Sequence, residues 1–153
     1  MQLNQKETSL LQDLKKQEEV CVEKYGRYSN DANDAQLKSL FGQIGQAEQQ
    51  HLNTITQILG GTVPQMPSGG GQQAQAGFTQ TYTAASADPN KAKDAFLCTD
   101  MLSTEKHVSS VYDTSIFEFK DTGIRNDLNH IQKEEQEHGE QLYNYMAANN
   151  MYG

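Results

Sequence analysis

The sequence predicts an all-α fold, a single four-helix bundle made of two repeated helical hairpins. Three observations predict it. Apolar residues recur at steps of three and four over four long segments, the spacing of one helix face. The second half of the chain repeats landmarks of the first at a constant offset of 87 positions, the separation of Glu18 from Glu105. A long segment rich in Gly and Gln separates the halves.

The first hairpin is expected over about residues 5–59. Its first helix covers about 5–32, where Leu11, Leu14, Cys21, Tyr25, Tyr28 and Ala32 share one face. A turn within residues 30–34 starts the second helix, which runs over about 34–59 and ends at Gly60, a natural stop signal. The face of the second helix carries Leu37, Phe41, Ile44, Glu48, His51, Ile55 and Ile58.

The Gly/Gln-rich connection covers about residues 60–88. Phe78 and Tyr82 are its large apolar residues, and we expect them to anchor it through one short helical turn. The rest of the connection is expected to be mobile. Its length suffices for a crossover that travels the whole bundle, since about thirty residues extend to about 100 Å.

The second hairpin is expected over about residues 89–150. Asp88 followed by Pro89 is an N-cap with proline at the first helical position, and this helix continues to about Lys120. The last helix starts near Asp121. The face of the helix that starts at Pro89 carries Cys98, Met101, Glu105, Val108, Tyr112 and Phe119. The face of the last helix carries Ile124, Leu128, Ile131, Glu135, His138, Leu142 and Tyr145.

Composition limits the function classes. The chain has 153 residues, enough for one domain, which we take as residues 1–153, and a formal net charge of -8. An acidic surface disfavours nucleic acid and anionic membranes as partners and suits a protein that binds cations. No segment is long and apolar enough for a membrane span, and the polar N-terminus predicts cytoplasmic synthesis without a signal peptide. Cys21 and Cys98 form no CxxC motif and are expected to be buried free thiols.

Acidic residues interrupt the apolar helix faces at equivalent places in both halves. Each Glu-x-x-His pair shares one face, because positions i and i+3 lie about 60° apart around a helix. Four buried carboxylates would be costly without compensation, and two divalent cations would neutralise them. One Glu from each of two helices plus Glu-x-x-His from each of the other two is the ligand set of di-iron and di-manganese bundles. The predicted ligands are Glu18, Glu48, His51, Glu105, Glu135 and His138.

Two alternatives stay open. A polar layer held by hydrogen bonds and protonation needs no metal, and zinc competes with iron or manganese for oxygen and imidazole ligands. The repeat favours Glu18 over its neighbour Glu19. The residues Glu134, Glu137, His107 and His130 fall off the helix faces and are expected to be solvated, with Glu137 a spare ligand.

Two pairs of residues lie close to the predicted ligands. Tyr25 and Tyr112 follow a ligand by seven residues, so each is either a core tyrosine or a hydrogen-bond donor to a ligand carboxylate. Gly42 and Gly45 are unfavourable in a helix and mark a close contact between helices or between subunits.

The residues also resemble a known family. The pattern Leu10-Leu11-x-Asp13-Leu14 through Glu18 and Tyr25-Gly26, then Leu37-x-x-Leu40-Phe41 through Glu48, resembles the Coat F family of bacterial spore coat proteins. The second half repeats it, and Tyr145-Met146 to Asn150-Met151-Tyr152 is similar to that family's closing Tyr-Met and Gly-Trp-Tyr. The resemblance implies a spore-forming bacterium, placement in the coat and other coat proteins as partners.

The ligand set further resembles the ferritin-like superfamily, which includes rubrerythrin and manganese catalase. By that resemblance the six residues would hold two iron or manganese ions, although no rubredoxin-type cysteine motif is present. Three functions follow: a coat protein with a metal core, which could react with peroxide or oxygen, a metal-free coat component, or a ferroxidase and iron-storage protein. We expect a homodimer rather than a storage cage.

Overall fold

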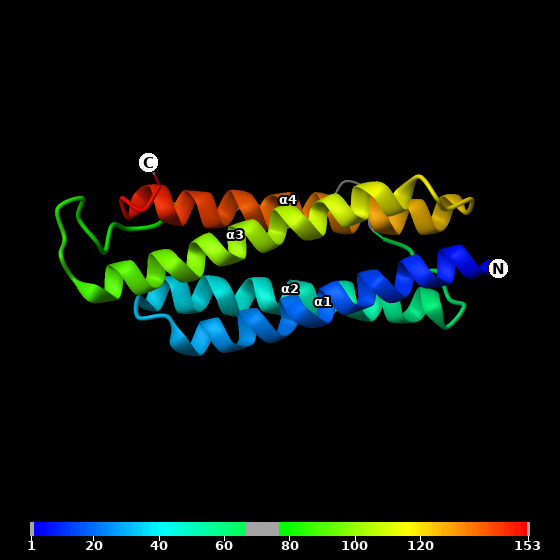
Figure 1. The fold of residues 1–153 in the computed structure, drawn as a ribbon, viewed down its shortest axis with the longest axis horizontal. Helices are drawn as coiled ribbons and strands as arrows, with labels where there is room; N and C mark the ends of the chain where they lie inside the picture. The colour runs from blue at the N-terminus through cyan, green and yellow to red at the C-terminus, as the bar shows by residue number, and fades with distance from the viewer. Residues whose placement is uncertain (1, 67–76, 153) are drawn as a thin grey trace.

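Four long helices make up this computed structural model, which describes residues 2–66 and 77–152 and contains no strand within them (Figure 1). The predicted all-helical class with four helices is therefore confirmed. Two antiparallel hairpins form the two layers of the bundle. The helices are α1 (Gln5–Asp31), α2 (Ala35–Leu59), α3 (Pro89–Ile116) and α4 (Thr122–Ala148).

Each helix begins where a side chain can satisfy the free backbone N–H groups of the first turn. At α1, the Asn4 side chain accepts from the N–H of Glu7, and the Glu7 carboxylate accepts from the N–H of Asn4, a reciprocal capping box. Aspartates cap the other three helices: Asp34, Asp88 and Asp121. These caps explain why the predicted starts fall within one or two residues of the observed ones.

The end of α3 differs from the prediction. The helix stops at Ile116 rather than continuing to about Lys120. Beyond it the N–H groups of Glu118 and Phe119 bond to Ser115 and Ile116, three residues back, which tightens the chain into a turn. The turn buries Phe119, whose predicted place in the core is therefore correct although it lies outside the helix.

The described parts of the connection between α2 and α3 lie at opposite ends of α4. Val63 packs beside Gly123, near the start of α4. Asn149, at the end of α4, accepts hydrogen bonds from the backbone N–H groups of Thr81 and Tyr82. The connection apart from Phe78 and Tyr82 is expected to be mobile, and residues 67–76 of it lie outside the described residues.

Phe78 and Tyr82 anchor the connection as predicted. Phe78 makes an edge-to-face contact with Tyr145, and the Tyr82 hydroxyl donates to Asp94 over 2.8 Å. The prediction of a short helical turn around these two residues is wrong. The backbone of Tyr82 instead bonds to the Asn149 side chain, which replaces the hydrogen bonds that a helical turn would supply.

The two hairpins are packed differently. A Cβ atom at Gly45 would lie only 3.2 Å from Cβ of Tyr25, so this glycine permits the close approach of α1 and α2. No such neighbour lies within 4 Å of Gly42 among the described residues. The contact between α1 and α2 is more extensive than that between α3 and α4.

The core is a continuous set of apolar side chains from all four helices, interrupted at mid-height by a layer of carboxylates and imidazoles. Cys21 and Cys98 are buried free thiols, as expected. In the described residues, none of the helices has the length and apolar character needed to cross a bilayer.

Candidate metal centre

The six predicted ligands meet in one buried layer at the centre of the bundle. Each is at most 3% exposed. The apolar faces of the helices point inward to the core, so the polar residues on the same faces are carried inward with them. Glu18 comes from α1, Glu48 and His51 from α2, Glu105 from α3, and Glu135 and His138 from α4.

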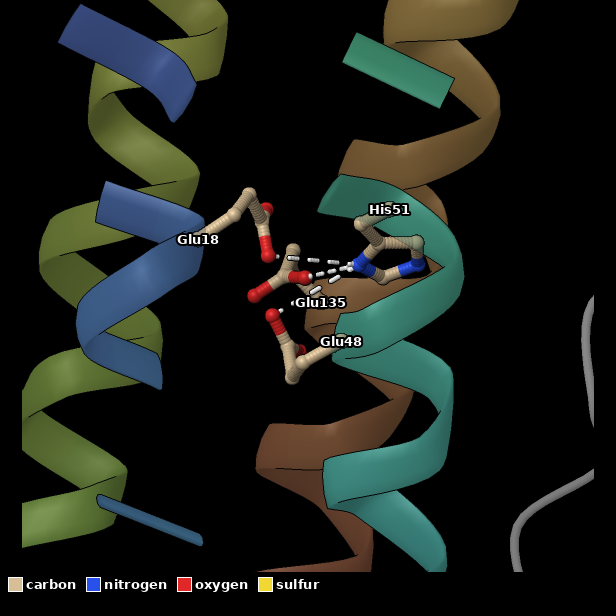
Figure 2. A group of neighbouring side chains, drawn as sticks. All are labelled: Glu18, Glu48, His51 and Glu135. Atoms are coloured by element: carbon tan, nitrogen blue, oxygen red, sulfur yellow. Dashed lines mark ion pairs between the residues drawn. The ribbon is translucent and has the colours of Figure 1, made fainter. Parts of the chain in front are cut away.

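One half of the layer surrounds His51 (Figure 2). The carboxylates of Glu18, Glu48 and Glu135 turn toward Nδ1 of the ring, at 3.8, 3.6 and 2.7 Å. One ligand atom from each of the four residues lies within 4.8 Å of all the others, a spacing that would hold one cation. These four residues are called the His51 cluster below.

The other half surrounds His138. Its Nδ1 lies 2.8 Å from Oε1 of Glu48 and 3.5 Å from Oε1 of Glu105. Glu48, Glu105, Glu135 and His138 satisfy the same spacing and are called the His138 cluster. Glu48 and Glu135 belong to both clusters, so the two candidate cation positions adjoin and share two carboxylates.

Many of the candidate metal-ligating atoms of the layer have no hydrogen-bond partner. Every one of the six residues has at least one buried side-chain oxygen or nitrogen without a hydrogen bond, including both oxygens of Glu48 and of Glu135 and Nδ1 of each histidine. The approach of Nδ1 of His51 to Glu135 is short, but its direction is not that of a hydrogen bond. Buried polar atoms without partners are costly. Two cations at the two positions would give these atoms their partners, so the residues present fit a dinuclear metal group.

The titration behaviour shows how protons balance the layer without a cation. Burial and the charge of Glu48 raise the pKa of Glu18, and burial and the charge of Glu105 raise the pKa of Glu135. Burial opposes a charge on His138, but the carboxylates of Glu105 and Glu48 together outweigh it and raise the His138 pKa to about 9. Protons on Glu18, Glu135 and His138 offset part of the negative charge of the layer, so the binding of a cation there would release protons.

The pKa values of Glu48 and His51 shift in the directions that favour an ion pair. Burial acts to raise the pKa of Glu48, but contacts with Glu18 and with the two histidines outweigh it and lower that pKa. Burial likewise acts to lower the pKa of His51, and the carboxylates of Glu134 and Glu48 outweigh it and raise that pKa.

Two tyrosines hold ligand carboxylates across the two hairpins. The Tyr112 hydroxyl of α3 donates to Glu18 of α1 over 2.6 Å, and the Tyr25 hydroxyl of α1 donates to Glu105 of α3 over 2.7 Å. Burial raises the pKa of both hydroxyls, which keeps them protonated as donors. Of the two interpretations open at the sequence level, the hydrogen-bond donor is the one the geometry shows.

Glu134 corrects the sequence analysis. Expected to be solvated, it lies with Oε1 2.8 Å from Nε2 of His51, and the same oxygen is 3.5 Å from Nε2 of His130. The contact with His51 lowers the pKa of Glu134 against the effect of burial. Glu134 lies off the apolar face of α4 and its partner belongs to another helix, so the periodicity of α4 gives no sign of this contact. His130 is accordingly half-buried rather than at the surface, whereas His107 is exposed as expected.

Glu137 is not the solvated residue expected either. The side chain is half-buried, its Oε2 has no hydrogen-bond partner, and burial raises its pKa. It belongs to neither cluster. Glu19, which the repeat ranked below Glu18, is exposed.

A pocket of about 580 Å³ lies between α3 and α4 and reaches the centre. Two of its lining residues, Glu105 and Glu135, belong to the His138 cluster. Both apolar and polar residues line the rest of it, among them Leu102, Tyr143, Ser109 and Gln132. The sequence pattern contained no signal for this pocket, because it arises from the spacing of the second hairpin.

The comparison with protein families concerns the second hairpin. Residues 93–153 match the family model of the Coat F domain. The Coat F match includes most of α3 and all of α4, and with them Glu105, Glu135 and His138. The first hairpin lies outside it. No curated protein and no solved structure matches the chain at a significant level.

Proposed function

We propose that this chain is a spore coat protein of ferritin-like architecture, with a crossover between its hairpins, that binds a dinuclear iron or manganese centre. The Coat F match over the second hairpin supports the placement in the coat. The unpartnered donor atoms of the two adjoining clusters carry the metal proposal. The six ligands would be Glu18, Glu48, His51, Glu105, Glu135 and His138.

The donor set favours iron or manganese. Carboxylate oxygens with one imidazole for each metal suit these ions better than metals that prefer thiolates, and zinc is the competing occupant. Four carboxylates carry the charge that two divalent cations neutralise. Bound iron or manganese would supply one-electron redox chemistry toward peroxide or dioxygen.

The protein's own residues would organise this centre. Glu48 and Glu135 would be shared between the two metals, because each belongs to both clusters. The hydroxyls of Tyr25 and Tyr112 would hold Glu105 and Glu18 in place as terminal ligands. The apolar core of the bundle would keep water and competing ligands from the layer except at the pocket between α3 and α4.

Elemental analysis of the purified chain tests the proposal. We expect about two iron or manganese ions per chain in the native protein, and loss of both in a Glu48→Gln, Glu135→Gln double variant. Glu19→Gln and Glu140→Gln, at exposed positions of α1 and α4, are the matched controls and should keep the metal. A native protein with less than one metal per chain, and a melting temperature unchanged by chelator, would contradict it.

The metal-free coat component is the second candidate, because protons can balance the layer. Metal content decides between the two. The homodimer expected from the sequence stays a prediction, and light scattering tests it. A cage of many subunits would instead favour iron storage. No nucleic acid or membrane is proposed as a partner.

A further inference from the structure

The internal repeat allows the two halves of the centre to be compared position by position. The offset of 87 places His51 on His138, and it places Glu134 on Ala47. The carboxylate that contacts Nε2 of His51 therefore has a methyl group as its counterpart near His138. Among the described residues, no acceptor bonds to Nε2 of His138, whose contacts are made by Nδ1.

A carboxylate on the outer nitrogen matters for a metal-binding imidazole. It fixes the orientation of the ring and the position of its proton, and it makes the inner nitrogen a better donor. Glu134 lies 2.8 Å from Nε2 of His51 and leaves Nδ1 turned toward the three carboxylates of the His51 cluster. The His138 cluster has no such support.

The same comparison explains the pocket. Gly45, which lets α1 and α2 approach closely, has Gln132 as its counterpart in α4. The Gln132 side chain occupies space between the helices and donates to the backbone carbonyl of Ser109 over 3.1 Å. Leu52 of α2 has Gly139 as its counterpart, and Gly139 lines the pocket. The larger side chain of Gln132 separates α3 from α4, and the missing side chain at Gly139 leaves space beside Glu105. Together they form the pocket.

We infer that the two clusters are unequal subsites. The His51 cluster is the tight, closed subsite, with Glu134 as its positioning residue. The His138 cluster is the weaker, exchangeable subsite, open to small anionic or peroxide-like ligands through the pocket between α3 and α4. The inference rests on the proposed metal centre and assigns a different role to each half of it.

Calorimetric titration of metal-free protein with Co²⁺ tests the first part. The wild type should bind two ions in steps separated by at least about tenfold. Glu134→Gln should weaken the first step by about 10–100-fold and leave the second unchanged. Glu140→Gln removes the same charge from an exposed position of α4 and should change neither step. Equal weakening of both steps in Glu134→Gln would overturn the inference.

Ligand substitutions assign the steps to the clusters. Glu18 belongs to the His51 cluster alone and Glu105 to the His138 cluster alone. Glu18→Gln should remove the tight step, and Glu105→Gln should remove the weak one. The reverse assignment would overturn the inference even with two ions bound.

Azide added to the Co²⁺-loaded protein tests the open subsite through the visible absorption of cobalt. The wild type should bind azide, and Glu105→Gln, which holds cobalt in the His51 cluster only, should not. Gly139→Leu places the side chain of the first hairpin in the pocket and should weaken azide binding at least about tenfold with both cobalt steps kept. Gly42→Leu, with open space around it, should behave as wild type.

Azide binding unchanged in Gly139→Leu would refute the pocket as the route. These outcomes are separate from a failure of the proposed function, in which the wild type would bind no cobalt at all.

Discussion

At the scale of one residue, Asp127 shows the effect of burying a carboxylate that is not fully hydrogen-bonded. It is buried, its Oδ2 has no hydrogen-bond partner, and its counterpart in the first hairpin is the apolar Leu40. Burial and the nearby charge of Asp121 raise the pKa of Asp127 to about 6. A raised carboxyl pKa favours the folded state at low pH, and this contribution is lost as the pH rises through about 6.

Asp127→Asn should therefore stabilise the protein only where Asp127 is ionised. We expect a gain of about 1 kcal/mol at pH 8, less than the full shift because solvent screens part of it, and no gain at pH 4. That corresponds to about 2–4 °C in melting temperature. Thermal unfolding at both pH values measures it, with the exposed Asp13→Asn as control. A gain of equal size at both pH values would contradict the explanation.

Asp94 is a second buried carboxylate, but both of its oxygens accept hydrogen bonds. Its two oxygens accept from the backbone N–H groups of Asn33 and Asp34, and one also accepts from Tyr82. Asp94→Ala should lower the free energy of unfolding by about 3 kcal/mol, because it leaves buried N–H groups without partners. Tyr82→Phe removes one bond and should cost about 1 kcal/mol. Urea unfolding compares them, and equal losses would contradict this ranking.

The residues of the centre were predictable to different degrees. The repeat pairs each of Glu18, Glu48 and His51 with an identical residue, and this symmetry located all six members of the layer. Glu134 has no such signal, because its counterpart is Ala47. Its contact with His51 crosses between helices far apart in sequence, and the periodicity of a single helix does not contain that information.

At the scale of elements, helix starts were predictable because an Asp or Asn cap is a local signal. The end of α3 was not, since no glycine or proline marks Ile116 and the chain turns where burial of Phe119 requires it. The difference in helix-to-helix spacing between the two hairpins was also not predictable from the sequence. It depends on which residues of the neighbouring helix face Gly45 and Gln132.

The two glycines of α2 give a matched test of that spacing. Gly42→Ala should raise the free energy of unfolding by up to about 1 kcal/mol, because alanine favours helix and nothing obstructs the new methyl group. Gly45→Ala should lose this gain or destabilise, since its Cβ would meet Cβ of Tyr25 at 3.2 Å and force α1 away from α2. Chemical denaturation distinguishes the variants. An equal gain in both would show that the helices are not held closely there.

At the scale of the whole molecule, the central layer connects all four helices, so its occupation should change global stability. Addition of Mn²⁺ or Fe²⁺ to metal-free protein should raise the melting temperature. At a free metal concentration one hundred times the dissociation constant, the free energy of unfolding should rise by about 2.7 kcal/mol. Differential scanning calorimetry measures the shift. The Glu48→Gln, Glu135→Gln double variant should show none, and a shift of the same size there would place the metal elsewhere.

The crossed tyrosine contacts have an evolutionary consequence. Tyr112 of the second hairpin reaches Glu18 of the first, and Tyr25 of the first reaches Glu105 of the second. Reciprocal contacts of this kind are those of a symmetric dimer, here contained in one chain. An ancestor with a single hairpin would have formed the complete centre only as a pair of identical chains. Gene duplication would then have freed each half to diverge, and Glu134 and Gly139 differ in this way from their counterparts Ala47 and Leu52.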